Sequence, residues 1–222
     1  MFRIKICGIT NTADAQVAAE AGAEAVGLNF YLGTPRCVTR QRAVEIAAAL
    51  PGDVARVGVF VNSPLDELLE TREEVGLDYL QLHGDEPPEM LLKLKLAGVL
   101  YLRAFRCGAD GLAPITDYLE SCRRSDALPE AVLIDAHAPG EYGGTGQTVD
   151  WEMLRPLAGR LFDCPLLLAG GLNPDNVGEA IAAAKPWGVD TASGVESSPG
   201  RKDAQRVRRF IDAARAALEA GD

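Results

Sequence analysis

Short apolar runs alternate with stretches of helical periodicity along the chain, and this alternation constrains the fold more than any other feature. Each run is rich in β-branched residues and too short to be a helix. The runs occupy residues 3–8, 25–30, 56–61, 79–83, 101–105, 131–135, 165–169 and 188–192. Stretches with helical spacing lie between them, such as residues 12–21, 40–50, 65–75, 89–97 and 176–184. Residues typical of helix ends and helix starts flank these stretches, namely Gly22, Gly76 and Gly98 after them and Pro64, Pro87 and Pro174 before them.

Strands that alternate with helices pair in parallel, because each helix returns the chain to the same end of the sheet. Eight such units favour a closed (βα)8 barrel, the TIM-barrel form of the α/β class. The alternative is an open doubly wound sheet, which usually has a glycine-rich turn after its first strand. Here that position reads Cys7-Gly8-Ile9-Thr10, so we favour the barrel. We see no linker-like tract and expect residues 1–222 to form a single catalytic domain.

Composition limits the partners that we expect. The net charge is -10, with 22 basic against 32 acidic residues, which argues against a nucleic-acid-binding surface. There is no stretch of 18 consecutive apolar residues, so we expect no membrane span. The first strand begins at the N-terminus without a signal segment, and the five cysteines lack the spacing of a zinc or redox motif. A cytoplasmic protein is the prediction, and its oligomeric state, monomer or homodimer, is left open.

The polar residues that follow the strands are the candidates for chemistry, because barrel enzymes place their active sites at the carboxyl ends of the strands. These candidates are Cys7, Asn29, Arg36, Asn62, His83, Arg103, Asp135, Gly170–Gly171 and Ser193–Gly194. Together they offer a base, an acid and a cradle for an anion. A cluster with metal-ligand spacing is missing, since His83 and His137 belong to different loops, so we expect no metal site.

Two loops predict a phosphate site. Gly170 and Gly171 follow the seventh strand, with Asn173 as the expected N-cap and Pro174 at the first helical position. Ser193 and Gly194 follow the eighth strand. Either pair alone is explained by a tight turn, but loops seven and eight together form the usual phosphate site of such barrels.

The remaining candidates each have a structural alternative. Cys7 is either a reactive thiol or an inert buried one, since free cysteines are commonly buried. Asp135 is either functional or the cap of the next segment, and a carboxylate after an apolar strand favours function. His83 either lines the site or makes a structural hydrogen bond. Arg36 either binds a carboxylate through its planar guanidinium or lies on the surface.

The motifs of the chain resemble those of the phosphoribosylanthranilate isomerase family over nearly its whole length. The match rests on Lys5-Ile6-Cys7-Gly8-Ile9-Thr10, Gly27-Leu28-Asn29-Phe30, Thr34-Pro35-Arg36, Val59-Phe60-Val61-Asn62, Leu80-Gln81-Leu82-His83-Gly84, Leu133-Ile134-Asp135-Ala136, Gly143-Gly144-Thr145-Gly146, Leu168-Ala169-Gly170-Gly171-Leu172-Asn173-Pro174 and Ser193-Gly194-Val195-Glu196. Two positions depart from the family pattern, Thr34 and Cys37, and they put the conformation of the second loop in doubt.

The resemblance implies a cofactor-free Amadori rearrangement of a small phosphorylated aminosugar, N-(5′-phosphoribosyl)anthranilate, in tryptophan biosynthesis. It implies that Asp135 is the general acid and Cys7 the general base, whose thiol pKa a positive environment would bring towards neutral. By the same resemblance, Arg36 holds the anthranilate carboxylate, and Gly171 and Gly194 donate backbone amides to the phosphate. Ser193 and His83 complete the substrate-binding residues that we predict.

Related barrels offer rival functions. The sugar isomerase of histidine biosynthesis would favour an aspartate after strand one, and a pentose-phosphate epimerase would need metal ligands on several strands. Cys7 stands where the first enzyme would have its aspartate, and a chain with only two histidines is poor in metal ligands for the second, so both functions are disfavoured. The alternative from a different class is a catalytically silent phosphosugar-binding barrel, which the presence of Cys7 and Asp135 disfavours.

Overall fold

Eight parallel strands close into a barrel, which confirms the predicted (βα)8 fold. The computed structural model describes all residues except 108–110, 136–150, 158 and 222. The strand order β6-β5-β4-β3-β2-β1-β9-β8 is closed by a parallel pairing of β6 with β8. The barrel strands are β1 (Ile4–Ile6), β2 (Ala25–Asn29), β3 (Ala55–Phe60), β4 (Tyr79–Leu82), β5 (Tyr101–Arg106), β6 (Ala131–Asp135), β8 (Cys164–Ala169) and β9 (Gly188–Thr191).

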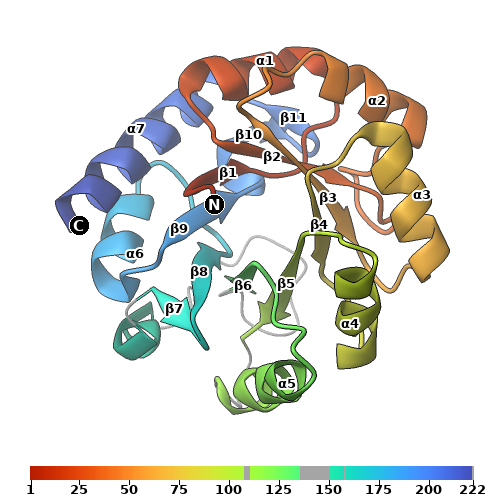
Figure 1. Ribbon diagram of the computed structural model, residues 1–222. Coiled ribbons are helices and arrows are strands. Elements are labelled where there is room, and N and C mark those ends of the chain that lie inside the picture. The colour runs from red at the N-terminus through yellow and green to blue at the C-terminus, as the bar shows by residue number, and fades with distance from the viewer. Residues whose placement is uncertain (108–110, 136–150, 158, 222) are drawn as a thin grey trace.

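Helices surround this ring of strands (Figure 1). Within the described residues they are α1 (Thr12–Ala21), α2 (Arg40–Ala48), α3 (Leu65–Val75), α4 (Pro88–Leu96), α5 (Ala113–Arg124), α6 (Val177–Ala184) and α7 (Ala204–Gly221), with two 3-10 helices, η1 (Trp151–Leu157) and η2 (Ser193–Val195). The last helix, α7, packs beside α1, so the end of the chain completes the outer layer next to its beginning.

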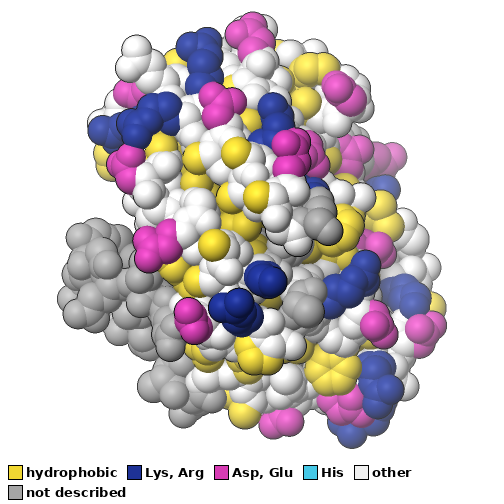
Figure 2. Space-filling view, turned by 90° about the vertical axis from the view of Figure 1, so that its left-hand side faces the viewer, with side chains coloured by type: hydrophobic (Ala, Val, Ile, Leu, Met, Phe, Trp, Pro, Cys, Tyr) yellow, Lys and Arg dark blue, Asp and Glu magenta, His cyan; other side chains and the backbone are white. Residues whose placement is uncertain are grey.

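The outer surface mixes charges of both signs. On the face that carries α6 and α7, Lys and Arg side chains lie among Asp and Glu side chains (Figure 2). Among the helices that the structure describes, none combines the length and the apolar character that crossing a membrane requires.

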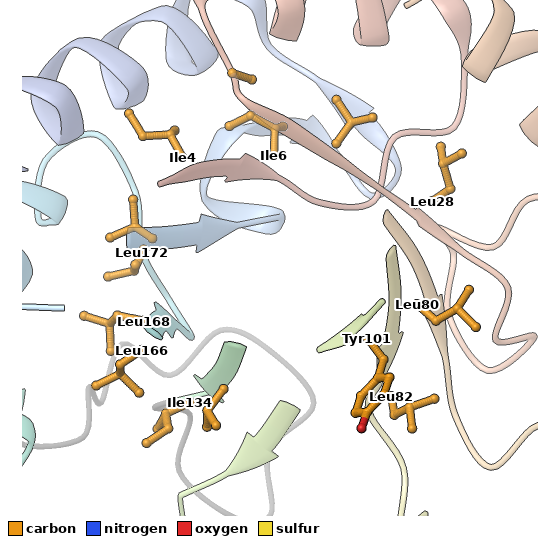
Figure 3. Packing of buried hydrophobic residues seen from close by; sticks show 14 of the residues in the cluster. Ile4, Ile6, Leu28, Leu80, Leu82, Tyr101, Ile134, Leu166, Leu168 and Leu172 are labelled. Carbon is orange, nitrogen blue, oxygen red and sulfur yellow. The ribbon is translucent and has the colours of Figure 1, made fainter. Parts of the chain in front are cut away.

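Alternation along the strands separates two apolar layers. One side of each strand faces the helices, as Ile6, Leu82 and Leu168 do, and these residues belong to the large core between barrel and helices (Figure 3). The intervening residues face the inside of the barrel, where Leu102 and Leu133 belong to a smaller cluster. The side chain of a strand-end residue is therefore directed inwards or outwards by its parity with these positions.

The predicted elements, including the helical stretch at 176–184, agree with the structure within two residues. The predicted capping positions of this last stretch lie too early, because we expected Pro174 at the first helical position, but α6 begins at Val177, with Asn176 in the N-cap position. The Asn173 side chain still accepts a hydrogen bond from the backbone N–H of Asp175 (2.8 Å), as a capping residue would. Residues 174–176 form a turn ahead of the helix.

Two short antiparallel pairs were not predicted. Strand β7 (Arg160–Leu161) pairs with β8 at its start, and β10 (Glu196–Ser198) pairs with β11 (Arg201–Lys202) in a hairpin after η2. These strands have two or three residues, which is too short for an apolar periodicity to be visible in the sequence. The β10–β11 hairpin matters for the site described next.

Candidate active site

Cys7 follows β1 directly and faces the inside of the barrel. Its side chain is buried, and its backbone N–H donates to the carbonyl of Thr191 (2.8 Å). The thiol lies against Gly27 of β2, where a Cβ atom would stand 2.6 Å from the Cys7 Sγ. Glycine at this position therefore makes the room that the thiol occupies.

Two residues inside the barrel set the charge around this thiol. The ammonium group of Lys5 is fully buried and donates a hydrogen bond to the carboxylate of Asp190 on β9 (2.8 Å). Burial lowers the pKa of Lys5, but Asp190 and Cys7 outweigh burial and leave that pKa raised, so Lys5 is a cation at neutral pH. A buried cation beside a thiol favours the thiolate form.

The predicted neutral pKa of Cys7 is not what this arrangement produces. Burial raises the pKa of the thiol, and Lys5 and Lys202 lower it without cancelling that effect. Asp190 adds to the increase, because its negative charge opposes a second anion nearby. The positive environment expected from the resemblance is present, but the desolvation of a buried thiolate has the larger effect on the pKa of Cys7.

Asp135 ends β6 and approaches His83, which follows β4. The Asp135 Oδ2 and His83 Nε2 atoms are 3.9 Å apart, a close approach rather than a short hydrogen bond. Burial and the charges of Lys5, Arg106 and Arg103 lower the pKa of His83 to about 4, so its ring is neutral at pH 7. The amide Nε2 of Gln81 lies 3.3 Å from His83 Nδ1. If Nδ1 accepts this hydrogen bond, the ring proton is on Nε2 and points towards Asp135.

Arg36 does bind a carboxylate through its planar guanidinium, but the carboxylate belongs to the protein. The Nε and Nη2 atoms of Arg36 donate to Glu196 Oε1 (2.8 Å) and Oε2 (2.7 Å), respectively. Glu196 is buried in the β10–β11 hairpin, and Lys202 Nζ also donates to its Oε1 (2.9 Å). The Arg36 side chain is thus held by the protein, with 22% of it exposed.

The seventh and eighth loops meet at the carboxyl end of the barrel. Gly170 and Gly171 both have positive φ angles (91° and 65°), which glycine adopts without strain. Gly194 lies so close to the preceding loop that a Cβ atom would stand 1.9 Å from the carbonyl oxygen of Leu172. The Thr191 hydroxyl donates to the same carbonyl (2.6 Å). Gly171 and Ser193 remain exposed, so the two loops form one surface at the barrel mouth.

Two strand-end candidates lie outside this group. Arg103 has outward parity on β5, and its guanidinium donates to the carbonyls of Leu82 (3.0 Å) and Gly84 (2.9 Å) while contacting the faces of Phe105 and Tyr118. Asn62 has a positive φ of 54°, and its side chain accepts from the backbone N–H of Asp85 (2.7 Å). Both residues stabilise loops outside the barrel.

The sequence reading missed five charged residues of the site: Lys5, Arg106, Asp190, Glu196 and Lys202. Lys5 and Asp190 were not among the candidates because they lie within apolar runs. The alternation along those runs nevertheless indicates that both side chains face the inside of the barrel. Arg106 extends β5 by one residue beyond the predicted end and is the register partner of Asp135. Glu196 stands in one of the family motifs quoted above, but nothing in the sequence indicated its contacts with Arg36 and Lys202, because the short β10–β11 hairpin shows no periodicity.

Comparison with known proteins completes the description of this site. Residues 4–213 match the model of the family described as N-(5'phosphoribosyl)anthranilate (PRA) isomerase. The chain belongs to this family. The class of enzyme that the sequence resemblance predicted, an isomerase, is confirmed with it.

Individual members of the phosphoribosylanthranilate isomerase family agree over nearly full length. The enzyme of that name from Rubrobacter xylanophilus is 46% identical over 217 residues, covering 97% of this chain and 100% of the relative. The crystal structure of the Thermotoga maritima isomerase superposes with a TM-score of 0.84 at 38% identity, covering 97% of this chain and all of that one. A further crystal structure of such an isomerase, in complex with reduced 1-(o-carboxyphenylamino)-1-deoxyribulose 5-phosphate, has a TM-score of 0.82 at 36% identity and the same coverage.

Proposed function

We propose that this chain catalyses the Amadori rearrangement of N-(5′-phosphoribosyl)anthranilate to 1-(2-carboxyphenylamino)-1-deoxyribulose 5-phosphate in tryptophan biosynthesis, within a single domain of residues 1–222. Family membership supports the reaction. The observation that carries it is the position of two side chains at the carboxyl end of the barrel: Cys7 directly follows β1, Asp135 ends β6, and both face the inside, together with the loops at Gly171 and Gly194.

In the proposed mechanism, Asp135 protonates the ribose ring oxygen and the ring opens to a Schiff base. The protonated imine nitrogen withdraws electrons and acidifies the hydrogen on sugar C2. The thiolate of Cys7 removes that proton, and the resulting enolamine tautomerises to the ketone product. Lys5 stabilises the thiolate, although burial keeps the pKa of the thiol raised. Neutral His83, beside Asp135, lines the site without competing for its proton.

The anionic ends of the substrate bind at separate places in this proposal. The phosphate lies against the backbone of Gly171 and Gly194 and beside Ser193, where paired loops present N–H groups. The anthranilate carboxylate binds Arg36. Glu196 occupies the Nε and Nη2 edge of that guanidinium, so the substrate uses the remaining Nη1 side.

Turnover tests the proposal directly. Adding purified protein to phosphoribosylanthranilate should abolish the fluorescence of the substrate as product forms. Binding without turnover would instead support the catalytically silent phosphosugar-binding barrel. The absence of a metal and a cofactor remains a prediction, and treatment with EDTA should leave the rate unchanged. Inactivation by EDTA that a divalent ion reverses would contradict the mechanism.

A further inference from the structure

Glu196 is the least expected member of the site, because its buried carboxylate binds the guanidinium of Arg36, the group that we propose binds the carboxylate of the substrate. Its side chain is 5% exposed and accepts from two cations, Arg36 and Lys202. Burial raises the pKa of Glu196, but the two cations outweigh burial and hold it below its usual range, so the group is ionised at neutral pH. The three side chains together carry one positive charge, which one further carboxylate would neutralise.

The aliphatic part of the Arg36 side chain is restrained as well as its guanidinium. Gly8 has a φ of 71°, and a Cβ atom at that position would stand 2.5 Å from the Cδ of Arg36. The aliphatic part of Arg36 therefore lies directly on the backbone of Gly8, one residue after Cys7. With the stem on Gly8 and the guanidinium on Glu196, little rotational freedom remains, and 22% of the side chain is still exposed.

We propose that Glu196 is a positioning residue, which orients the guanidinium of Arg36 so that its free edge meets the aromatic carboxylate of the substrate. This inference rests on the proposed function, and it extends it by assigning the orientation of the substrate to a residue that does not touch the reacting atoms. A flexible arginine would lose side-chain entropy on binding the carboxylate, whereas the restrained one has lost it already.

The alternative role, a competitor that the substrate displaces, fits the contacts less well. Glu196 is held independently of Arg36 by Lys202, whose side chain is fully buried. The carbonyl of Glu196 accepts from Arg206 Nη1 (2.6 Å), and its strand pairs with β11. The backbone N–H of Lys202 donates in turn to Asp14 of α1 (2.8 Å). Displacing Glu196 would leave a buried carboxylate with one partner fewer, which is costly.

The same segment links the two anion-binding places. Glu196 follows η2 (Ser193–Val195), and its backbone N–H donates to the carbonyl of Ser193. Ser193, in the loop that we assign to the phosphate, and Glu196, which holds Arg36, are thus three residues apart in the sequence. This short segment then sets the separation between the phosphate site and the carboxylate site. Two anion sites held in this way suit a substrate that carries an anionic group at each end.

Steady-state kinetics of Glu196→Gln tests the inference. The amide keeps the shape of the side chain but removes its charge and one of its acceptor oxygens. We expect KM for phosphoribosylanthranilate to rise roughly tenfold with a smaller change in kcat, as for a lost charge-assisted contact. The analogue with aniline in place of anthranilate should lose nothing, because it has no carboxylate to orient. In an Arg36→Met background, Glu196→Gln should add no further penalty.

Several results would overturn the inference. Equal losses with both substrates, or additive losses with Arg36→Met, would give Glu196 a structural role only. A decrease in KM would identify Glu196 as a competitor. Glu70→Gln is the matched control, because it removes the same charge from an exposed ion pair with Arg40 on the outer surface (3.2 Å) and should leave both constants unchanged.

Folding and the proposed function are checked separately. Thermal unfolding shows whether Glu196→Gln is folded; if it is not, Glu196→Asp, which keeps the charge but shortens the reach, must show the same carboxylate-specific rise in KM. Wild-type protein without any turnover would refute the proposed function. An active wild type with an unaltered Glu196→Gln variant would refute this inference alone.

Discussion

Replacing Asp190 with Asn should destabilise the protein severely, because it leaves the charge of Lys5 buried without its partner. The Lys5 side chain is 0% exposed and that of Asp190 10% exposed, and their Nζ and Oδ1 atoms are 2.8 Å apart. Removing one partner of a buried ion pair typically costs about 3–5 kcal/mol. For a chain of this size, this corresponds to a decrease in Tm of roughly 6–20 °C.

The pH dependence of this loss identifies its cause. Without Asp190, burial should hold the pKa of Lys5 below its unfolded value, so the folded protein prefers the neutral amine. The stability lost at neutral pH should then be recovered in part as pH rises towards the unfolded pKa of about 10.4. Urea denaturation at pH 7 and pH 9.5 measures both effects.

The exposed pair of Lys95 and Asp126 provides a matched control. Its Nζ and Oδ2 atoms are 2.9 Å apart, but the two side chains are 45% and 95% exposed. Asp126→Asn should change stability by less than about 1 kcal/mol, because water screens the pair. If Asp190→Asn were no more destabilising than Asp126→Asn, Lys5 would not depend on Asp190, and the account of the charge beside Cys7 would be wrong.

Three further predictions concern the remaining site residues. Gly171→Val should raise KM, since a β-branched residue is strained at a φ of 65°, and a phosphate-free substrate analogue should bind worse than the substrate; equal binding would exclude a phosphate site at this loop. Arg36→Lys should lower kcat/KM by roughly ten- to a hundredfold, mostly through a higher KM, because a point charge cannot replace the planar guanidinium. Near-normal kinetics of this variant would exclude Arg36 as the group that binds the anthranilate carboxylate. His83 has a folded pKa of about 4, so the folded protein resists its protonation, and the stability that the neutral ring contributes is complete above pH 6.5 and lost as pH falls towards 4. The free energy of unfolding of His83→Gln, measured with urea, should therefore decline less than that of the wild type between pH 6.5 and 4. An equal decline in both proteins would refute the assignment.

The fold was predictable because its signal is repeated. Eight apolar runs with helical stretches between them fix parallel pairing, and small errors at single boundaries do not change the topology. The helix expected at Pro174 shows the limit of such reading, since a proline and a capping Asn also suit the turn that precedes Val177. The position of an element was therefore easier to predict than its first residue.

The site was predictable only where its residues follow strands. Cys7, His83 and Asp135 were predicted in this way, and their side chains face the inside of the barrel, whereas the alternation along β5 directs the predicted candidate Arg103 outwards. The bidentate pair of Arg36 and Glu196 joins residues 160 positions apart, and periodicity carries no information about such a contact. The pKa of Cys7 likewise depends on the balance of burial against nearby charges, and the sequence pattern does not show how deeply the thiol is buried or how near those charges lie.

Single-site kinetics of Cys7 and Asp135 on phosphoribosylanthranilate tests the central claim most directly. Cys7→Ser and Asp135→Asn keep the shapes of these side chains but remove an effective base and an acid, respectively. If the two residues transfer protons, each replacement should lower kcat by roughly 10²-fold or more, with a modest change in KM and an unaltered fold. A variant of either kind that turns over substrate at nearly the wild-type kcat would contradict the account.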